Sequence, residues 1–168
     1  SLQESAAPAS GDALHEPFIP LVERAVRNDG TIGIKIIGPG WGSSGYYGRD
    51  VLERDIPRIF PAGTKMFWKH ATPTEESERP EGDLNNLAGV TVSAPYWLDG
   101  GQSGAGMYAD ARPFGTYAPV IDEIGSHIGV SIRALGRHSV GEAEGRQGRI
   151  IEELVSGKSI DYVTAPGA

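Results

Sequence analysis

A serine stands in the middle of an apolar stretch at residues 127–135, which reads His-Ile-Gly-Val-Ser-Ile-Arg-Ala-Leu. Alternation along an extended chain puts Ser131 on the face opposite to Val130 and Ile132, beside a glycine that has no side chain to cover it. A serine hydroxyl becomes a useful nucleophile when a base lies within hydrogen-bonding distance. Ser131 is therefore the candidate nucleophile, and the alternative is an ordinary polar residue on a half-solvated strand.

Histidine is the usual base for such a hydroxyl, because imidazole titrates close to neutral pH. The chain has four histidines. In an extended strand His127 lies about 13 Å from Ser131, at roughly 3.3 Å per residue. The odd offset of His138 directs it to the opposite face unless a turn redirects it, and His15 belongs to a polar N-terminal arm. His70, which ends a separate strand-like run, remains as the candidate general base.

A third group usually holds the base in the correct tautomer and stabilises the imidazolium that forms. Asp161 is the candidate, because a carboxylate inside a strand needs a partner to offset the cost of its burial. A surface salt bridge is the alternative role for Asp161, and Glu152, Glu153 and His138 remain alternatives for the third position. Arg133, on the same face as the candidate nucleophile, is either an electrostatic anchor or a solvent-facing strand residue.

Composition limits the fold and the partners. The 168 residues suffice for one domain with a single core, and the absence of cysteine excludes a disulfide framework. The net charge of −7 argues against a general nucleic-acid binder. No apolar run is as long as a membrane span and no signal peptide is evident, so we expect no membrane partner. The histidines lack metal-ligand spacing, and we expect neither a metal nor a cofactor.

A G-x-G-x-x-G pattern formed by Gly40, Gly42 and Gly45 follows a predicted strand. A dinucleotide site would require a helix to open at the last glycine and an acidic residue to end the next strand. Here residues 46–48 precede the next predicted helix, and the next strand ends in a lysine and a histidine. The pattern therefore predicts a glycine-rich surface loop.

The remaining elements must bring these residues together. The patterns predict strands over 31–37, 64–69 and 127–135, helices over 18–26, 49–60 (interrupted at Pro57) and 117–124, and a long hairpin built from 84–97 and 106–114. A flexible charged loop over 136–148 is expected to precede two strands, 149–155 and 158–164, joined by a tight turn at 156–157. We expect a disordered arm over 1–16, and a single α+β domain over 17–168 built as a small mixed β-barrel with surrounding helices.

These stretches together resemble the head-maturation (prohead) proteases of tailed phages, serine proteases related in fold to the herpesvirus assemblins. The resemblance runs in order through residues 40–47, 51–55, 60–64, 68–70, 79–82, 127–134 and 160–164. It implies an assemblin-like barrel and places the general base at His70. Assemblins use a second histidine as the third member, whereas their phage relatives have an acidic residue on a closing strand.

The resemblance also implies an activity. It predicts a serine endopeptidase that cleaves scaffold and capsid protein segments, and itself, inside the immature procapsid in the host cytoplasm. A homodimer or higher oligomer is a further expectation. The alternative is a non-enzymatic capsid-assembly or scaffold-binding module that keeps the same barrel.

Overall fold

The computed structural model describes residues 11–15, 19–20, 25–26, 28–100 and 104–164. The strands are β1 (Asp12–His15), β2 (Ile19–Pro20), β3 (Ala25–Val26), β4 (Ile32–Ile37), β5 (Gly40–Trp41), β6 (Tyr46–Tyr47), β7 (Lys65–Phe67), β8 (Leu87–Thr91), β9 (Tyr96–Leu98), β10 (Gly106–Pro113), β11 (Ile128–Ala143) and β12 (Arg146–Thr164). The helices are α1 (Arg49–Ile59), α2 (Pro73–Glu78) and α3 (Ala118–Ile124), with single 3-10 turns at Leu84–Asn86 and Gly125–His127.

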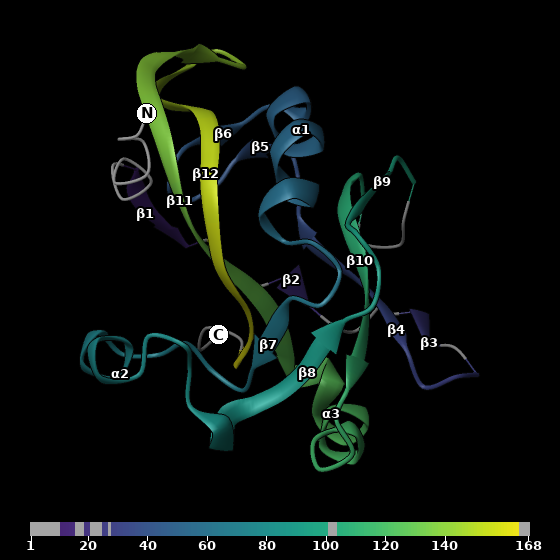
Figure 1. Cartoon of the computed structure of the whole chain (residues 1–168). Coiled ribbons are helices and arrows are strands. Elements are labelled where there is room, and N and C mark those ends of the chain that lie inside the picture. The colour runs from purple at the N-terminus through teal and green to yellow at the C-terminus, as the bar shows by residue number, and fades with distance from the viewer. Residues whose placement is uncertain (1–10, 16–18, 21–24, 27, 101–103, 165–168) are drawn as a thin grey trace.

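The strands of the described residues form one mixed sheet that curls into a half-barrel with few helices (Figure 1). Its main path runs β1-β11-β12-β7-β8-β10-β4-β3, while β2 joins β11, β9 joins β10, and the small β5–β6 hairpin joins β12. Strand β12 pairs in parallel with β6 and β7, and the other neighbours are antiparallel. The glycine pattern of the sequence lies on the β5–β6 hairpin, with α1 beginning only at Arg49.

The long β11–β12 hairpin replaces the flexible loop that the sequence predicted over 136–148. Its strands pair from Ile128 opposite Thr164 to Ala143 opposite Arg146, so two residues form the turn. Glu144 and Gly145 have φ angles of 52° and 77°. Two successive positive φ angles define the type I′ turn, whose twist matches that of paired strands. The charged residues of segment 136–148 therefore lie along the two-stranded β11–β12 hairpin.

Strand β12 is continuous, and the turn predicted at residues 156–157 is wrong. A Cβ on Gly157 would lie 2.5 Å from the carbonyl oxygen of Ile59 and 2.6 Å from the ring of Phe60. Glycine at this position therefore lets the end of α1 pack closely against the strand. It does not reverse the chain, contrary to the prediction from the sequence. Sequence alone offers no distinction between these two uses.

Three bulges interrupt the β11–β12 pairing, because Glu152, Val155 and Lys158 have no partner in the register. Helix α1 contacts the first two bulges. Arg54 donates to the carbonyl of Glu152 over 2.9 Å, and Arg58 donates to that of Val155 over 3.2 Å. Bulged residues leave ladder groups unpaired, so these guanidinium groups replace the missing partners.

Asp55 completes the attachment of α1 to β12. Its buried carboxylate accepts hydrogen bonds from Arg54, from Arg58 and from the backbone N–H of Leu154 at 2.9 Å. Burial opposes ionisation of this group, but the three donors outweigh burial and lower the pKa of Asp55. The carboxylate therefore stays charged where the bulged strand meets the helix.

Three other predictions also differ from the structure, wholly or in part. In the region expected to be helical over 18–26, the described residues form β2 and β3, and a proline in β2 is unsuited to a helix interior. The first strand of the expected long hairpin is split into β8 and β9, both paired with β10. Between them Ser93 accepts a hydrogen bond from the Asp110 N–H, and Pro95 has no N–H to donate. Within the arm expected over 1–16, residues 12–15 form β1 against β11.

Conversely, α1 continues through the interruption expected at Pro57. This proline lies in the last turn of the helix, which ends at Ile59. Pro57 therefore removes one backbone hydrogen bond of the helix. Because the helix ends two residues later, few further helical hydrogen bonds remain to be disturbed.

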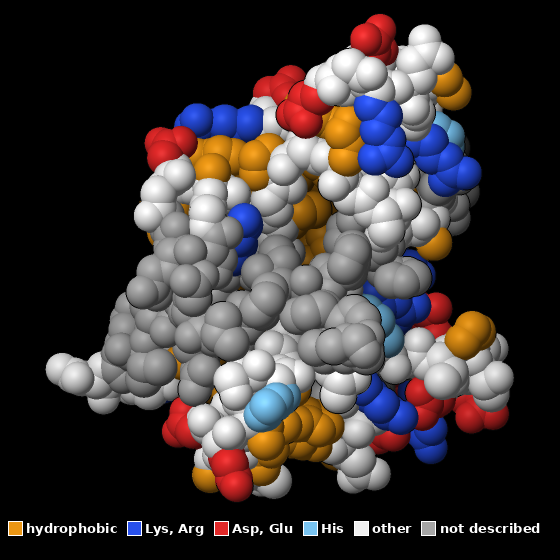
Figure 2. Space-filling view, turned by 180° about the vertical axis from the view of Figure 1, so that it is seen from behind, with side chains coloured by type: hydrophobic (Ala, Val, Ile, Leu, Met, Phe, Trp, Pro, Cys, Tyr) orange, Lys and Arg blue, Asp and Glu red, His pale blue; other side chains and the backbone are white. Residues whose placement is uncertain are grey.

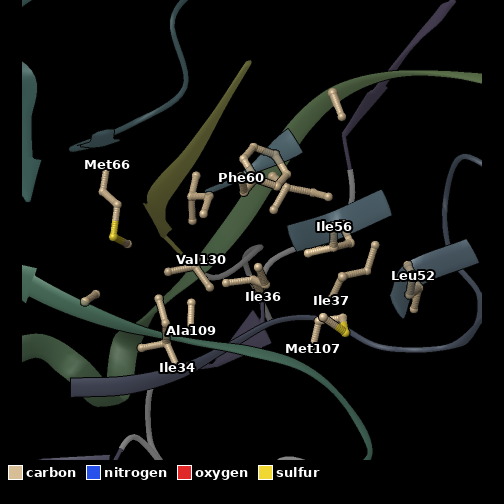
Figure 3. Close-up of a cluster of buried hydrophobic side chains, with 14 of the residues drawn as sticks. Ile34, Ile36, Ile37, Leu52, Ile56, Phe60, Met66, Met107, Ala109 and Val130 are labelled. Atoms are coloured by element: carbon tan, nitrogen blue, oxygen red, sulfur yellow. The ribbon is translucent and has the colours of Figure 1, made fainter. Parts of the chain in front are cut away.

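The core fills the concave side of the curled sheet, and Figure 3 shows part of it. Side chains of β4, α1, β7, β10 and β11 meet there and are almost fully buried: Ile34, Ile36, Ile37, Leu52, Ile56, Met66, Met107, Ala109 and Val130. None of the helices in the described ranges is both long and apolar enough to cross a membrane.

Replacing Gly157 with alanine tests the contact between α1 and β12. The added methyl group meets backbone and ring atoms, so we expect a loss of about 1–3 kcal/mol in the free energy of unfolding. Urea denaturation measures it. Gly115→Ala is the matched control, because a Cβ there has no heavy atom within 4 Å. Equal stability of the two variants would contradict the close approach.

Candidate active site

Three neighbouring strands bring the candidate catalytic residues together. Ser131 on β11 lies directly opposite Asp161 on β12 in the antiparallel register. On the other side of β12, Phe67 of the parallel strand β7 pairs with Asp161. Residues opposite each other in adjacent strands share a face of the sheet, so the hydroxyl and the carboxylate point the same way. His70 lies three residues beyond Phe67, within reach of both.

The imidazole of His70 connects the other two side chains. Its Nδ1 lies 2.5 Å from Oδ2 of Asp161, and its Nε2 lies 3.2 Å from Oγ of Ser131. Ser131 is 3% exposed and Asp161 is 1% exposed, whereas the His70 side chain is 28% exposed. The histidine therefore forms the more accessible side of the site.

The hydrogen-bonding partners determine the tautomer. An ionised carboxylate only accepts hydrogen bonds, so Nδ1 of His70 carries the proton that points at Asp161. The lone pair on Nε2 then accepts the hydroxyl proton of Ser131. This is the arrangement in which an imidazole can remove a proton from a serine hydroxyl.

Ser159 is a fourth polar residue of the site. Its hydroxyl donates to Oδ2 of Asp161 over 2.9 Å, and it is itself 6% exposed. The second carboxylate oxygen, Oδ1, has no hydrogen-bond donor among the described residues. Alternation along the strand places Ser159 and Asp161 on the same face, so this residue could have been found from the sequence.

The chain around His70 is held from one side by aromatic contacts. The ring of Trp68 lies 5.0 Å from that of Tyr117, before α3, and 5.6 Å from that of Tyr162 on β12. The backbone N–H of Trp68 donates to the carbonyl of Asn86 at 2.7 Å. The next residue, Lys69, has a φ of 152°, a backbone conformation that residues other than glycine rarely adopt. Strained backbone of this kind concentrates at functional sites.

A cavity of about 320 Å³ lies beside the carboxylate, between the sheet and the segment that carries α2. Phe67, Asp161 and Arg133 contribute to its wall. Gly82 also lines this cavity and packs directly on Phe67, since a Cβ at Gly82 would lie 2.3 Å from the Phe67 ring and its φ is 99°. Glycine is thus required for this segment to close over the sheet.

Arg133 points from β11 toward α2, where its guanidinium pairs with Glu76 at 2.8 Å. Lys158 lies 3.3 Å from the same carboxylate oxygen. Partial burial opposes the ionisation of Glu76, but the two cations outweigh burial and lower the pKa of Glu76. Sequence patterns contain no reason to select Glu76 among the surface acids of this segment.

The other candidate residues lie elsewhere. Glu152 accepts a hydrogen bond from Ser139, and Glu153 pairs with Arg137, all on the part of the hairpin beyond Ser131. His138 also lies there, opposite Ile151 in the register. His127 is exposed at the end of the 3-10 turn that precedes β11, and the side chain of His15 is outside the described part. No cluster of three metal-ligating side chains occurs among the residues that the structure describes.

Comparison with known proteins gives one similar fold. No family model matches the sequence, and no curated protein matches it. Among solved structures, the chain is similar to the capsid assembly protease gp21 of bacteriophage T4, with a TM-score of 0.47 and 16% sequence identity, over 89% of this chain and 94% of that one. The neighbour is a phage capsid assembly protease, the class of protein that the sequence resembles. Because identity and TM-score are low, the chemistry must follow from this chain's own side chains.

Replacing Ser159 with alanine tests the environment of the buried carboxylate. The change removes a donor from Asp161, so we expect the free energy of unfolding to fall by about 1.5–3 kcal/mol, as for other hydrogen bonds to charged groups. The matched control is Ser139→Ala, which removes a serine–carboxylate bond of 2.7 Å at an exposed position. We expect the control to lose less than about 0.5 kcal/mol. Similar losses in urea denaturation would contradict the burial of Asp161.

Proposed function

We propose that this chain is a serine endopeptidase of the phage prohead-protease type, with an assemblin-like barrel. Ser131 is the nucleophile, His70 the general base and acid, and Asp161 the residue that orients His70. One observation carries the proposal: a single imidazole hydrogen-bonds to the serine hydroxyl through one nitrogen and to a buried carboxylate through the other.

The reaction follows from that geometry. As Oγ of Ser131 attacks the carbonyl carbon of a peptide bond, its proton passes to Nε2 of His70, and Asp161 stabilises the imidazolium. When the tetrahedral intermediate collapses, the same proton goes to the leaving amine and an acyl-enzyme remains. His70 then removes a proton from a water molecule, which attacks the ester, releases the second product and regenerates the Ser131 hydroxyl.

The family resemblance of the sequence supports the choice of substrates. The proposed substrates are segments of scaffold and capsid proteins, and of the protease itself, within the immature procapsid. The alternative, an assembly module without activity, predicts a folded protein whose serine has ordinary reactivity. Chemical reactivity of Ser131 therefore separates the two functions.

The reactivity of Ser131 can be tested with a fluorophosphonate probe. We expect the native protein to become labelled on Ser131, because His70 activates the hydroxyl, and mass spectrometry of the digested protein locates the adduct. Ser131→Ala and His70→Ala should abolish the labelling, whereas Ser139→Ala, at an exposed serine on the same strand, should retain it.

Circular dichroism must show that each variant is folded. Labelling that persists in Ser131→Ala, or a folded native protein that is never labelled, would support the assembly module instead.

The third member of the triad can be tested by its effect on rate. Asp161→Asn keeps the shape but favours the wrong imidazole tautomer, so we expect the rate of reaction with the probe to fall about 10⁴-fold. The controls are Glu152→Gln and Glu153→Gln, whose carboxylates contact Ser139 and Arg137. These should react at the native rate. A large loss in either control, with Asp161→Asn near native, would reassign the position.

A further inference from the structure

The position of His70 is only partly fixed by the sheet. Strand β7 ends at Phe67, and the N–H of Trp68 makes the last backbone hydrogen bond before the chain turns at Lys69. His70 therefore follows a strained residue and itself lies outside any helix or strand. Its imidazole must nevertheless lie within hydrogen-bonding distance of two partners on two other strands.

The segment after His70 is stiffened immediately. Thr72 caps α2 by a reciprocal pair of hydrogen bonds with Glu75, at 3.1 Å and 2.9 Å. Only one residue, Ala71, separates this cap from His70. A movement of α2 is therefore transmitted directly to the backbone that carries the imidazole.

Glu76 attaches this helix to both of the other strands of the site. Its carboxylate binds Arg133, two residues from Ser131 on β11, and Lys158, three residues from Asp161 on β12. Lys158 is the bulged residue of β12 in this region, and bulges redirect side chains near active sites. Acidic and basic side chains lie side by side at the lower right of Figure 2, the corner occupied by α2.

We propose that Glu76 is a positioning residue for the catalytic base. Its ion pairs with Arg133 and Lys158 hold α2 against β11 and β12, and thereby keep the His70 imidazole between Ser131 and Asp161. The inference rests on the proposed function for its catalytic consequence, while the geometry that it describes can be measured without activity.

The test compares Glu76→Gln with Glu78→Gln on the full chain. Glu78 belongs to the same helix but has no ion pair in the described part of the chain, so it controls for a charge change on α2. We expect Glu76→Gln to lower the rate of reaction with the fluorophosphonate about 10- to 100-fold, as for a displacement of about 1 Å in a catalytic group. Glu78→Gln should react at the native rate.

Proton NMR supplies a readout that does not need activity. The His70 Nδ1–H, hydrogen-bonded to Asp161, should give a strongly downfield resonance in the native protein and in Glu78→Gln. In Glu76→Gln we expect that resonance to move upfield or to broaden beyond detection. If the native protein shows the resonance but never reacts with the probe, the proposed function fails while the positioning role is still decided by NMR.

A double-mutant cycle guards against a merely structural effect. Arg133→Gln should reproduce part of the loss of rate. The double variant with Glu76→Gln should lose less than the sum of the two single losses, because both changes break the Arg133–Glu76 pair, whereas only Glu76→Gln also breaks the pair with Lys158. High salt should slow the native protein and leave Glu76→Gln unchanged, since screening weakens the ion pairs. Additive losses, or an unchanged His70 resonance in Glu76→Gln, would overturn the proposal. If Glu76→Gln does not fold, Arg133→Gln and the salt response of the native protein decide between the two outcomes.

Discussion

The register between β11 and β12 is the constraint on which the candidate site depends. Counting from the type I′ turn, each of the three bulges adds one residue to β12, so that Ser131 lies opposite Asp161. Without the bulges the serine would face Lys158, and loss of only one would place it opposite Ile160. Because side chains alternate between faces, even that one-residue slip would separate the hydroxyl from the carboxylate. Helix α1 therefore helps to build a site that it does not contact, since Arg54 and Arg58 bind the carbonyls that the bulges release.

Burial makes the site electrostatically demanding. An ionised carboxylate that is 1% exposed has lost nearly all contact with water, and such a group is tolerated only with donors close to it. Among the described residues Asp161 has two such donors, the imidazole of His70 and the hydroxyl of Ser159, both at the same oxygen. The carboxylate therefore attracts the imidazole strongly, while Trp68 and α2 hold the chain on either side of it. The strained backbone at Lys69 is consistent with a histidine that is positioned by its side-chain partners more than by its own strand.

The sequence predicted local features well where one periodicity dominated. The apolar stretch around Ser131, the helix that begins at Arg49 and the strand before Gly38 follow directly from alternation, helical spacing and turn residues. Elimination among four histidines selected His70, which the structure brings to Ser131. Two of the errors share a cause, which is that glycines and charged residues occur in more than one kind of structure. Gly157 marks a close approach of α1 rather than a turn, and the charged residues 136–148 form a ribbon because Glu144 and Gly145 reverse the chain in two residues. Bulges and the ion pairs of Glu76 depend on tertiary contacts, for which a single sequence contains no periodic signal.

The buried carboxylate also bears on which function the fold serves. A module that only bound a scaffold could fill the position of Asp161 with an apolar residue, and replacing buried charges by apolar groups is often neutral or stabilising. Folding alone therefore gives no reason to keep an acid there, nor to keep a serine hydroxyl that is 3% exposed directly opposite it. A catalytic histidine accounts for both the buried acid and the buried serine. The acid orients the imidazole and stabilises the imidazolium that forms when the imidazole takes the serine proton. The costly burial of Asp161 therefore supports the proposed acyl transfer over the alternative of passive assembly.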